Sequence, residues 1–324
     1  MLLKLFRSQQ PANFFVIPAI ALLLWLPSFF HAPPAYKPLQ EMPLYHLFGA
    51  WAHHWTGTVF AWLLVVGQAL YLNYLINKYE VLYKPSFLPA LLFVLLMSFS
   101  SQVMWLHPVI FVNLLILAFF DKTFSLFKHP SPIRMLFESS FFSGMAFLFY
   151  FPAAIFYLLL LLSLGIIRSL SLREWMVTMI GFLLPLYFAC VWFFWQGTLG
   201  TFIATLKPHL PDFSLLSGIV WTKALIAECL FILALGTLSL LRLRRYFYKN
   251  TIRTRSNQRV FVYALFTAAA SLLIVPQAGL FHFTLFALPL AVFIGYYFLS
   301  FKAKPWIGEL LFILLAVAVI WNQF

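Results

Sequence analysis

Glu41 is the side chain in this sequence best suited to acid–base chemistry, because it lies in a polar stretch of an apolar chain. The stretch covers 33–55 and also carries three of the eight histidines. A carboxylate there can act as a general base, or can orient a hydroxyl or amine of a substrate. It can equally cap the helix expected from Leu44, since a helix N-terminus favours a carboxylate. We assign Glu41 as the candidate catalytic residue and leave the capping role open.

The histidines of this stretch do not predict a metal site. His46 and His53 are seven residues apart, which is about 10 Å along a helix. Two ligands of one ion must lie closer than that. We therefore assign no metal and no cofactor, and interpret these histidines as interfacial side chains.

A later polar loop, 196–218, offers a second set of candidate residues. Its motif KPHLPD contains Lys207, His209 and Asp212, and its two prolines make the segment stiff and non-helical. A cation beside an imidazole can bind a phosphate or pyrophosphate. His282 opens a later apolar segment and could line a recess beside the first loop. These four residues are the substrate-binding candidates, with a plain surface loop and an interfacial histidine as the alternatives.

Glu228 is the candidate intramembrane polar residue, because it stands on an apolar background within 219–241. An acid at that depth is expensive and tends to face a cavity or a partner. A structural hydrogen bond to another helix is the alternative. Cys190 and Cys229 also fall in apolar segments, and we interpret them as small buried residues rather than a disulfide.

The composition requires a membrane protein. Hydrophobic residues make up 64% of the chain and charged residues 9%, and a soluble domain cannot bury that much apolar surface. Several runs approach the roughly 20 residues needed to span a bilayer as a helix. We predict one all-α integral membrane domain, 1–324, a polytopic transmembrane helical bundle of about eleven helices. The expected spans are 14–30, 57–76, 87–99, 109–120, 141–150, 153–167, 176–195, 219–241, 260–275, 281–299 and 307–321.

The charges set the orientation of these spans. With the N-terminus in the cytoplasm, 18 of the 21 Lys and Arg lie on the cytoplasmic side, and the exceptions are Lys37, Lys207 and Lys223. This is the positive-inside pattern. The strongest basic run, 242–259, is therefore interpreted as a topology determinant beside the anionic inner leaflet. No basic and aromatic binding module accompanies it, so we expect no nucleic-acid partner.

The loops and hairpins carry further local predictions. The apolar residues Leu44, Leu47, Phe48, Trp51 and Trp55 recur at helical spacing. This predicts a short interfacial helix in the first outer loop, with its Trp side toward the membrane.

Two predicted hairpins, 87–120 and 141–167, have arms too short for the roughly 30 Å hydrocarbon core. Arms that stop part-way would leave a recess open to one face. The segment 121–140 is expected to be a long loop between these hairpins.

Three segments resemble an uncharacterised Bacteroidota inner-membrane family: FRSQQPANFF, the stretch from FYFPAAIFY to FLLPLYF, and HFTLFALPLAVFIGYYF. The segment Arg168 to Trp175, R-x-x-x-x-R-E-W, is the most recognisable part. The layout is also similar to GT-C glycosyltransferases. That resemblance implies sugar transfer from a polyprenyl-phosphate donor at the outer face, with Glu41 as the catalytic acid. The segment SSQVMWLHP lacks the acids such enzymes commonly carry in a second outer loop.

These observations leave three hypotheses open. The first is a protein of the bacterial inner membrane that acts on or binds a lipid-linked substrate, a polyprenyl-phosphate glycan or a lipid, at the outer face in envelope biogenesis. The second is a non-catalytic membrane subunit of an envelope biogenesis, secretion or motility complex with partner membrane proteins. The third is a transporter that uses Glu228. No motif names a reaction, so enzymatic activity is left open.

Overall fold

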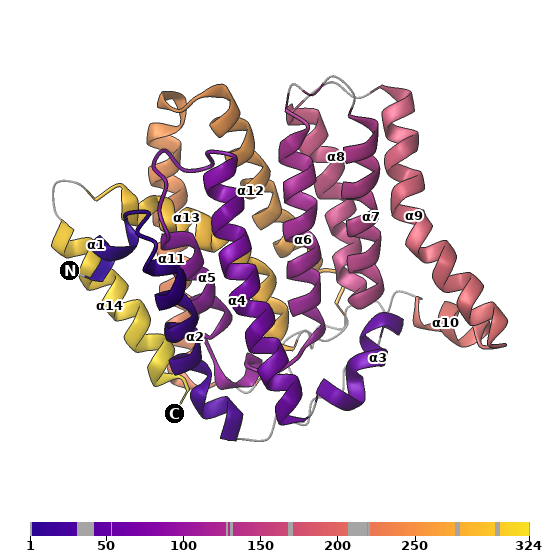
Figure 1. Cartoon of the computed structure of the whole chain (residues 1–324), viewed down its shortest axis with the longest axis horizontal. Coiled ribbons are helices and arrows are strands. Elements are labelled where there is room, and N and C mark those ends of the chain that lie inside the picture. The colour runs from indigo at the N-terminus through magenta and orange to yellow at the C-terminus, as the bar shows by residue number, and fades with distance from the viewer. Residues whose placement is uncertain are drawn as a thin grey trace.

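The structure is a computed structural model that describes residues 2–30, 42–52, 54–127, 129, 132–167, 171–206, 219, 221–275, 279–301 and 305–323. Within these ranges the regular structure is helical, without strands (Figure 1). The α-helices are α1 Leu2–Phe6, α2 Asn13–Phe30, α3 Pro43–Ala52, α4 Trp55–Lys78, α5 Leu88–Met97, α6 Pro108–Ser125, α7 Ile133–Phe149, α8 Phe156–Ile167, α9 Leu172–Trp195, α10 Leu199–Thr205, α11 Lys223–Tyr246, α12 Ile252–Ser271, α13 Ala287–Leu299 and α14 Pro305–Trp321. Short 3-10 turns are η1 Ser101–Val103, η2 Phe151–Ile155, η3 Phe247–Lys249 and η4 Leu280–Phe286.

The all-α architecture is confirmed for the described residues, and it is compatible with a membrane-spanning bundle. Six segments are long and apolar enough to cross a bilayer, by length and composition: Asn13–Phe30, Trp55–Lys78, Pro108–Ser125, Leu172–Trp195, Lys223–Lys249 and Leu280–Leu299. A helix also overlaps each of the other predicted ranges. The number of crossings and their direction stay predictions.

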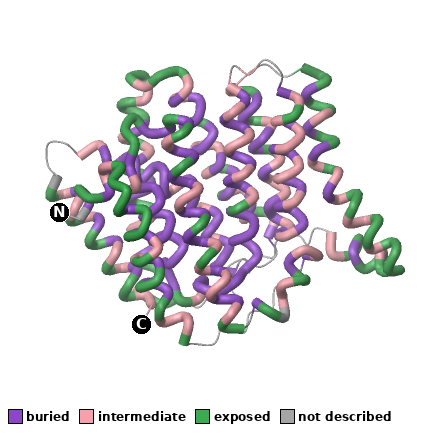
Figure 2. The backbone as a smooth tube through the Cα atoms, viewed as in Figure 1, coloured by how far each residue is buried: buried purple, intermediate pink, exposed green. Residues whose placement is uncertain are grey.

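Two short helices, α5 and α13, form the centre of the bundle. Every residue of α5 is buried, as is every residue of α13 except Leu290, and the two helices pack on each other (Figure 2). A helix that is apolar all round is expected in such a position, since it has no face to present to water. Helices α2 and α4 pack on α5, and α11 and α12 pack on α13.

The first hairpin has a short arm, as predicted, and its continuation is irregular. Helix α5 has ten residues, about 15 Å at 1.5 Å per residue, and the following stretch 98–107 is mostly buried without forming an α-helix. Backbone groups at that depth must be satisfied inside the protein. The carbonyl of Ser98 accepts a bond from Gln323 Nε2 at 3.2 Å, and that of Leu106 accepts one from the Tyr45 hydroxyl at 2.9 Å.

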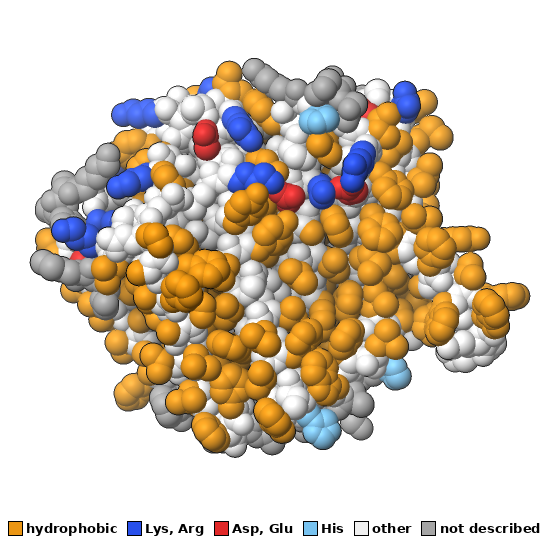
Figure 3. Space-filling model, in the orientation of Figure 1, with side chains coloured by type: hydrophobic (Ala, Val, Ile, Leu, Met, Phe, Trp, Pro, Cys, Tyr) orange, Lys and Arg blue, Asp and Glu red, His pale blue; other side chains and the backbone are white. Residues whose placement is uncertain are grey.

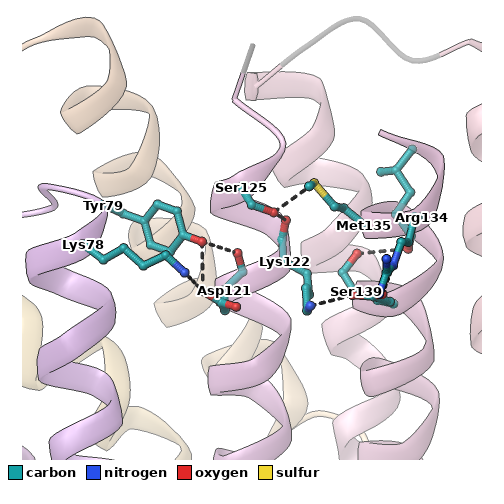
Figure 4. Close-up of polar contacts among 10 residues, drawn as sticks. Lys78, Tyr79, Asp121, Lys122, Ser125, Arg134, Met135 and Ser139 are labelled. Atoms are coloured by element: carbon teal, nitrogen blue, oxygen red, sulfur yellow. Dashed lines mark hydrogen bonds and ion pairs between the residues drawn. The ribbon is translucent and has the colours of Figure 1, made fainter. Parts of the chain in front are cut away.

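The predicted long loop 121–140 is wrong. Helix α6 continues to Ser125 and α7 begins at Ile133, because the charged residues pair between helices instead of facing water in a loop (Figure 4). Lys122 Nζ lies 2.6 Å from Glu138 Oε2. The bonds to Lys122 and then Arg134 lower the pKa of the Glu138 carboxyl below its usual range.

A similar contact joins the C-terminal end of α4 to α6. Lys78 Nζ lies 2.9 Å from Asp121 Oδ1, and the Tyr79 hydroxyl donates to the same oxygen at 2.9 Å (Figure 4). Burial and the Asp121 carboxylate raise the pKa of the Tyr79 hydroxyl to about 12. The charged ends of α4, α6 and α7 are thus tied together at one level of the bundle.

Polar residues of the basic run 242–259 hold two parts of the bundle together, a role that the charge pattern did not predict. Thr254, Asn257 and Gln258 donate from the first turns of α12 to the three consecutive backbone carbonyls of 79–81, at 2.9, 3.0 and 2.9 Å. All three side chains are buried. The turn after α4 is therefore held by α12 through side-chain hydrogen bonds.

Replacing Asn257 with Ala should destabilise this junction. The buried carbonyl of Tyr79 would lose its donor, which costs about 1–3 kcal/mol. We expect a lower midpoint of thermal unfolding in mild detergent, whereas Ile252→Ala on the exposed face of the same helix should leave the midpoint nearly unchanged. Equal midpoints for Asn257→Ala and the wild type would show that the carbonyl finds another donor.

Residues 171–175 of the segment singled out by resemblance, RSLSLREW, cap and begin helix α9. Ser171 accepts a bond from the backbone N–H of Glu174, whose carboxylate accepts one from the backbone N–H of Ser171. This capping box satisfies two backbone donors at the helix start. The capping box therefore gives Ser171 and Glu174 of this segment a structural role.

Lys and Arg side chains gather toward one end of the bundle, on the side of the α11–α12 turn (Figure 3). That arrangement agrees with the predicted sorting of charges. The short helix of the first loop is also present as α3, which begins at Pro43. Tyr45 and Phe48 attach it to the bundle, and the Phe48 ring lies 4.8 Å from that of Phe111. Leu47 and Trp51 are exposed, as expected of side chains that face a membrane.

Candidate functional site

An apolar groove runs between α11, α12 and the η4–α13 segment. Its cavity volume is about 550 Å³, within the range of about 300–1,000 Å³ usual for small-ligand sites. Leu96 and Phe99 of the first hairpin form part of its floor, and the second hairpin contributes nothing to it. The other lining residues are Trp221, Ile226, Cys229, Leu230, Ile232, Leu233, Gly236, Thr237, Leu240, Leu265, Phe266, Ala269, Phe283, Phe286, Ala287 and Leu290.

The groove exists because α11 and α12 have different packing partners. Helix α11 packs mainly on α13 and α14, and α12 packs mainly on α8 and α13. The hydrogen bonds from Thr254, Asn257 and Gln258 to the 79–81 turn fix the N-terminal end of α12. Gly236 brings α11 close to α13, since a Cβ at this position would lie 3.0 Å from Leu290 Cδ2.

One face of α11 supplies the long wall of the groove. Lining residues recur every three or four positions, which places them on one side of a helix: Ile226, Leu230, Leu233, Thr237 and Leu240. Ile226 to Leu240 spans about 21 Å at 1.5 Å per residue. The lining thus follows α11 for about four helical turns, a length that an extended chain can occupy.

The groove is open toward the lipid-facing surface. Leu230, Leu233 and Phe266 line it and are each at least 60% exposed. In a membrane protein such side chains contact hydrocarbon, not water. A lipid chain can thus enter sideways from the bilayer.

Glu228 lies on the opposite face of α11, within the bundle. Its carboxylate is 2% exposed, and its Oε2 accepts a hydrogen bond from Asn322 Nδ2 after the end of α14. The structural alternative for this acid, a hydrogen bond to another helix, is therefore present. Because α11 starts at Lys223, Glu228 lies in the second turn of this helix.

Two substitutions at Glu228 distinguish the role of its hydrogen bond from the role of its charge. Glu228→Gln keeps the contact with Asn322 and should change the free energy of unfolding by less than about 1 kcal/mol. Glu228→Leu leaves the Asn322 amide without its acceptor and should cost about 1–3 kcal/mol. Thermal unfolding of both variants in mild detergent checks this. A large loss for Gln alone would mean that the carboxyl group has a further role.

Comparisons with known proteins add nothing to the site. No protein-family model, curated protein or solved structure matches this chain. The assignment of the groove therefore rests on its geometry.

His282 is sealed in the bundle, with none of its surface exposed. The Tyr150 hydroxyl lies 2.8 Å from its Nδ1, and the Ser271 hydroxyl lies 3.0 Å from its Nε2. Ser271 also donates to the carbonyl of Ala268 at 2.7 Å. One consistent set of protons has Tyr150 donating to Nδ1 and Nε2–H donating to Ser271. In this arrangement His282 links three segments, and it is not among the residues that line the groove.

His107 is a second buried histidine that the sequence analysis did not single out. It precedes α6, and neither ring nitrogen has a hydrogen-bond partner in the described structure. Its ring centroid lies 5.9 Å from that of Trp105 and 5.5 Å from that of Phe281. Its only sequence signal is its place in the apolar WLHP segment, which does not distinguish a buried histidine from an exposed one.

Four predicted site residues, Glu41, Lys207, His209 and Asp212, lie outside the described residues. The structure therefore does not test whether they converge with His282. In the described ranges, no group of three or more His, Cys, Asp and Glu side chains could hold a metal ion. Cys190 and Cys229 are free, in agreement with the expected lack of a disulfide, but they are half-buried and not buried as predicted.

Proposed function

We propose that this protein binds or acts on a lipid-linked substrate at the outer face of a bacterial inner membrane, in the biogenesis of the cell envelope. The substrate class is a lipid or a glycan carried on a polyprenyl phosphate. The chain of that substrate occupies the groove between α11, α12 and α13. Residues of the outer loops then handle the part of the substrate that projects from the membrane.

The single observation that carries this proposal is the groove itself. It is long, apolar along its wall and open to the lipid-facing surface. Lining residues of α12 and η4 cluster near the ends of these elements that lie away from the α11–α12 turn. Under the predicted N-in orientation, the groove begins at the outer end of α11 and runs past the middle of this helix.

The proposal is tested in cells that lack the protein. We expect a lipid-linked envelope precursor to accumulate and to return to its normal level with the wild-type gene, but not with a variant whose groove is filled by Leu233→Trp. Lipid extraction and mass spectrometry measure the precursor. An unchanged lipid and glycan profile in the deletion strain would contradict the proposal.

A second candidate function is a non-catalytic subunit of an envelope complex, and helix α9 favours it. In an apolar 18-residue stretch of α9, only 17% of the residues are buried in the described structure. Helix α7 supplies most of the packing of α9. It projects with α10 from the side of the bundle (Figure 1). Large exposed side chains cover its free face, including Trp175, Tyr187, Trp192 and Trp195. Aromatic residues of this kind are enriched in protein interfaces.

Purification at native expression in a mild detergent distinguishes the two functions. A partner membrane protein at fixed stoichiometry, lost on substitution of Trp192 and Tyr187 by Ala, would support the subunit function. A lone monomer of 37.5 kDa would count against it and leave the lipid-binding proposal standing.

A further inference from the structure

The wall of the groove continues into a charged residue. Lys223 lies three positions before Ile226 and seven before Leu230, so it falls on the same helical face of α11 as the lining residues. It is exposed at the first residue of the helix, and Trp221 beside it lines the groove. A cation therefore stands at one end of an apolar channel.

Lys223 is also set apart from the other positive charges. Among the described residues, the other lysines and arginines lie in or beside the opposite ends of the helices, as at Lys78, Lys122, Arg134 and the 242–259 run. Along α11, Arg244 and Arg245 lie 21 and 22 positions after Lys223, about 32–33 Å at 1.5 Å per residue. No ion pair is formed by Lys223 within the described ranges.

The apolar wall alone gives little selectivity. A lipid chain in the bilayer is already in a medium as apolar as leucine, so it gains no hydrophobic free energy on entering the groove. Discrimination between lipids must therefore come from the shape of the groove and from polar contacts at its end. Lys223 is the described charge in position to make such a contact.

We infer that the groove selects an anionic lipid, whose phosphate is bound by Lys223 while one of its chains lies along α11. The inference rests on the proposed function and specifies the headgroup that the groove accepts. The backbone N–H groups of Lys223 and Ala224 assist, since the first N–H groups of a helix have no partner within it and attract a phosphate. The N–H of Leu225 already donates to Thr222 Oγ1 at 3.1 Å. Trp221 lies at the depth where an aromatic ring borders the headgroups.

The inference is tested by lipid retention in native mass spectrometry. The purified protein is incubated with phosphatidylglycerol or phosphatidylcholine of identical chains, which differ in net headgroup charge. We expect the wild type to retain phosphatidylglycerol about fivefold better, the value of one basic residue near an anionic lipid. Lys223→Gln should abolish this preference, and Lys223→Glu should reverse it. Lys249→Gln removes an exposed cation at the other end of α11 and should leave the preference intact.

A groove-filled variant separates failure of this inference from failure of the proposed function. If Leu233→Trp retains both lipids as well as the wild type does, the groove is not a lipid site and both ideas fall. If Leu233→Trp lowers retention but Lys223→Gln leaves the preference unchanged, the groove stands and the headgroup assignment is wrong. Displacement of phosphatidylglycerol by millimolar inorganic phosphate alone would assign Lys223 to a soluble anion and overturn the lipid assignment.

Discussion

Leu233→Trp should lower the amount of bound lipid that survives purification by tenfold or more. Leu233 lines the middle of the groove, two helical turns from Ile226. An indole ring there would occupy the path of an extended chain, and overpacking of this kind costs about 1–3 kcal/mol. Because each 1.4 kcal/mol is a factor of ten in affinity, the loss should be measurable by lipid extraction from the purified protein.

The matched control is Leu238→Trp. Leu238 lies on the same helix and is 44% exposed, but it does not line the groove. It should retain wild-type lipid and wild-type thermal stability. If both Trp variants lose lipid equally, the bound lipid belongs to the general lipid-facing surface of α11 and not to the groove.

His282→Leu should be the most destabilising of the single substitutions considered. Leucine fills much of the imidazole volume but leaves the hydroxyls of Tyr150 and Ser271 without their partner. Unpaired buried polar groups cost about 1–3 kcal/mol each. Ser271 keeps its bond to Ala268, so we expect a total near 2–4 kcal/mol, measured as a lower midpoint of thermal unfolding in detergent.

His54→Leu provides the control, since His54 is exposed before α4 and should change stability little. The double variant His282→Leu with Tyr150→Phe removes the orphaned phenol and should recover part of the loss. If His282→Leu instead folds as well as the wild type but abolishes the processing of envelope lipids, the histidine acts on substrate and its structural role is wrong.

The composition and the distribution of charge predicted the fold class. An apolar chain with sorted positive charges predicted a helical membrane bundle, and helices overlap the predicted ranges. The helix of the first outer loop followed from the spacing of Leu44 to Trp55, and Pro43 marks its start. These features depend on local periodicity and on transfer from water to hydrocarbon, both of which a single sequence contains.

Pairing between helices was not predictable in the same way. The loop expected at 121–140 was wrong because charges that form ion pairs between helices resemble charges that face water. For the same reason, the sequence did not predict the role of Asn257 and Gln258, which lie within a basic run. Their buried amide groups donate hydrogen bonds to backbone carbonyls of the 79–81 turn. Which partner a polar side chain finds depends on the tertiary arrangement.

The candidate site shows the same division. Glu228 was identified correctly as a polar residue within an apolar helix, and its partner Asn322 lies 94 positions away. No motif predicted the groove, because its lining residues are ordinary apolar residues. They form a groove only because α11 and α12 pack on different neighbours. Lys223 drew attention only as an exception to the charge pattern, and its place on the groove face became clear once the lining residues were known.

The most direct test of the groove is photo-crosslinking in a bilayer. An anionic lipid with a photoreactive group on its chain is incorporated at low mole fraction, and adducts are mapped by mass spectrometry. We predict saturable adducts on Leu230, Leu233 and Phe266, which unlabelled anionic lipid displaces. Labelling of Met179 and Leu183, which are exposed on α9, should rise linearly without saturation. Equal and linear labelling of both sets would contradict a lipid site in the groove.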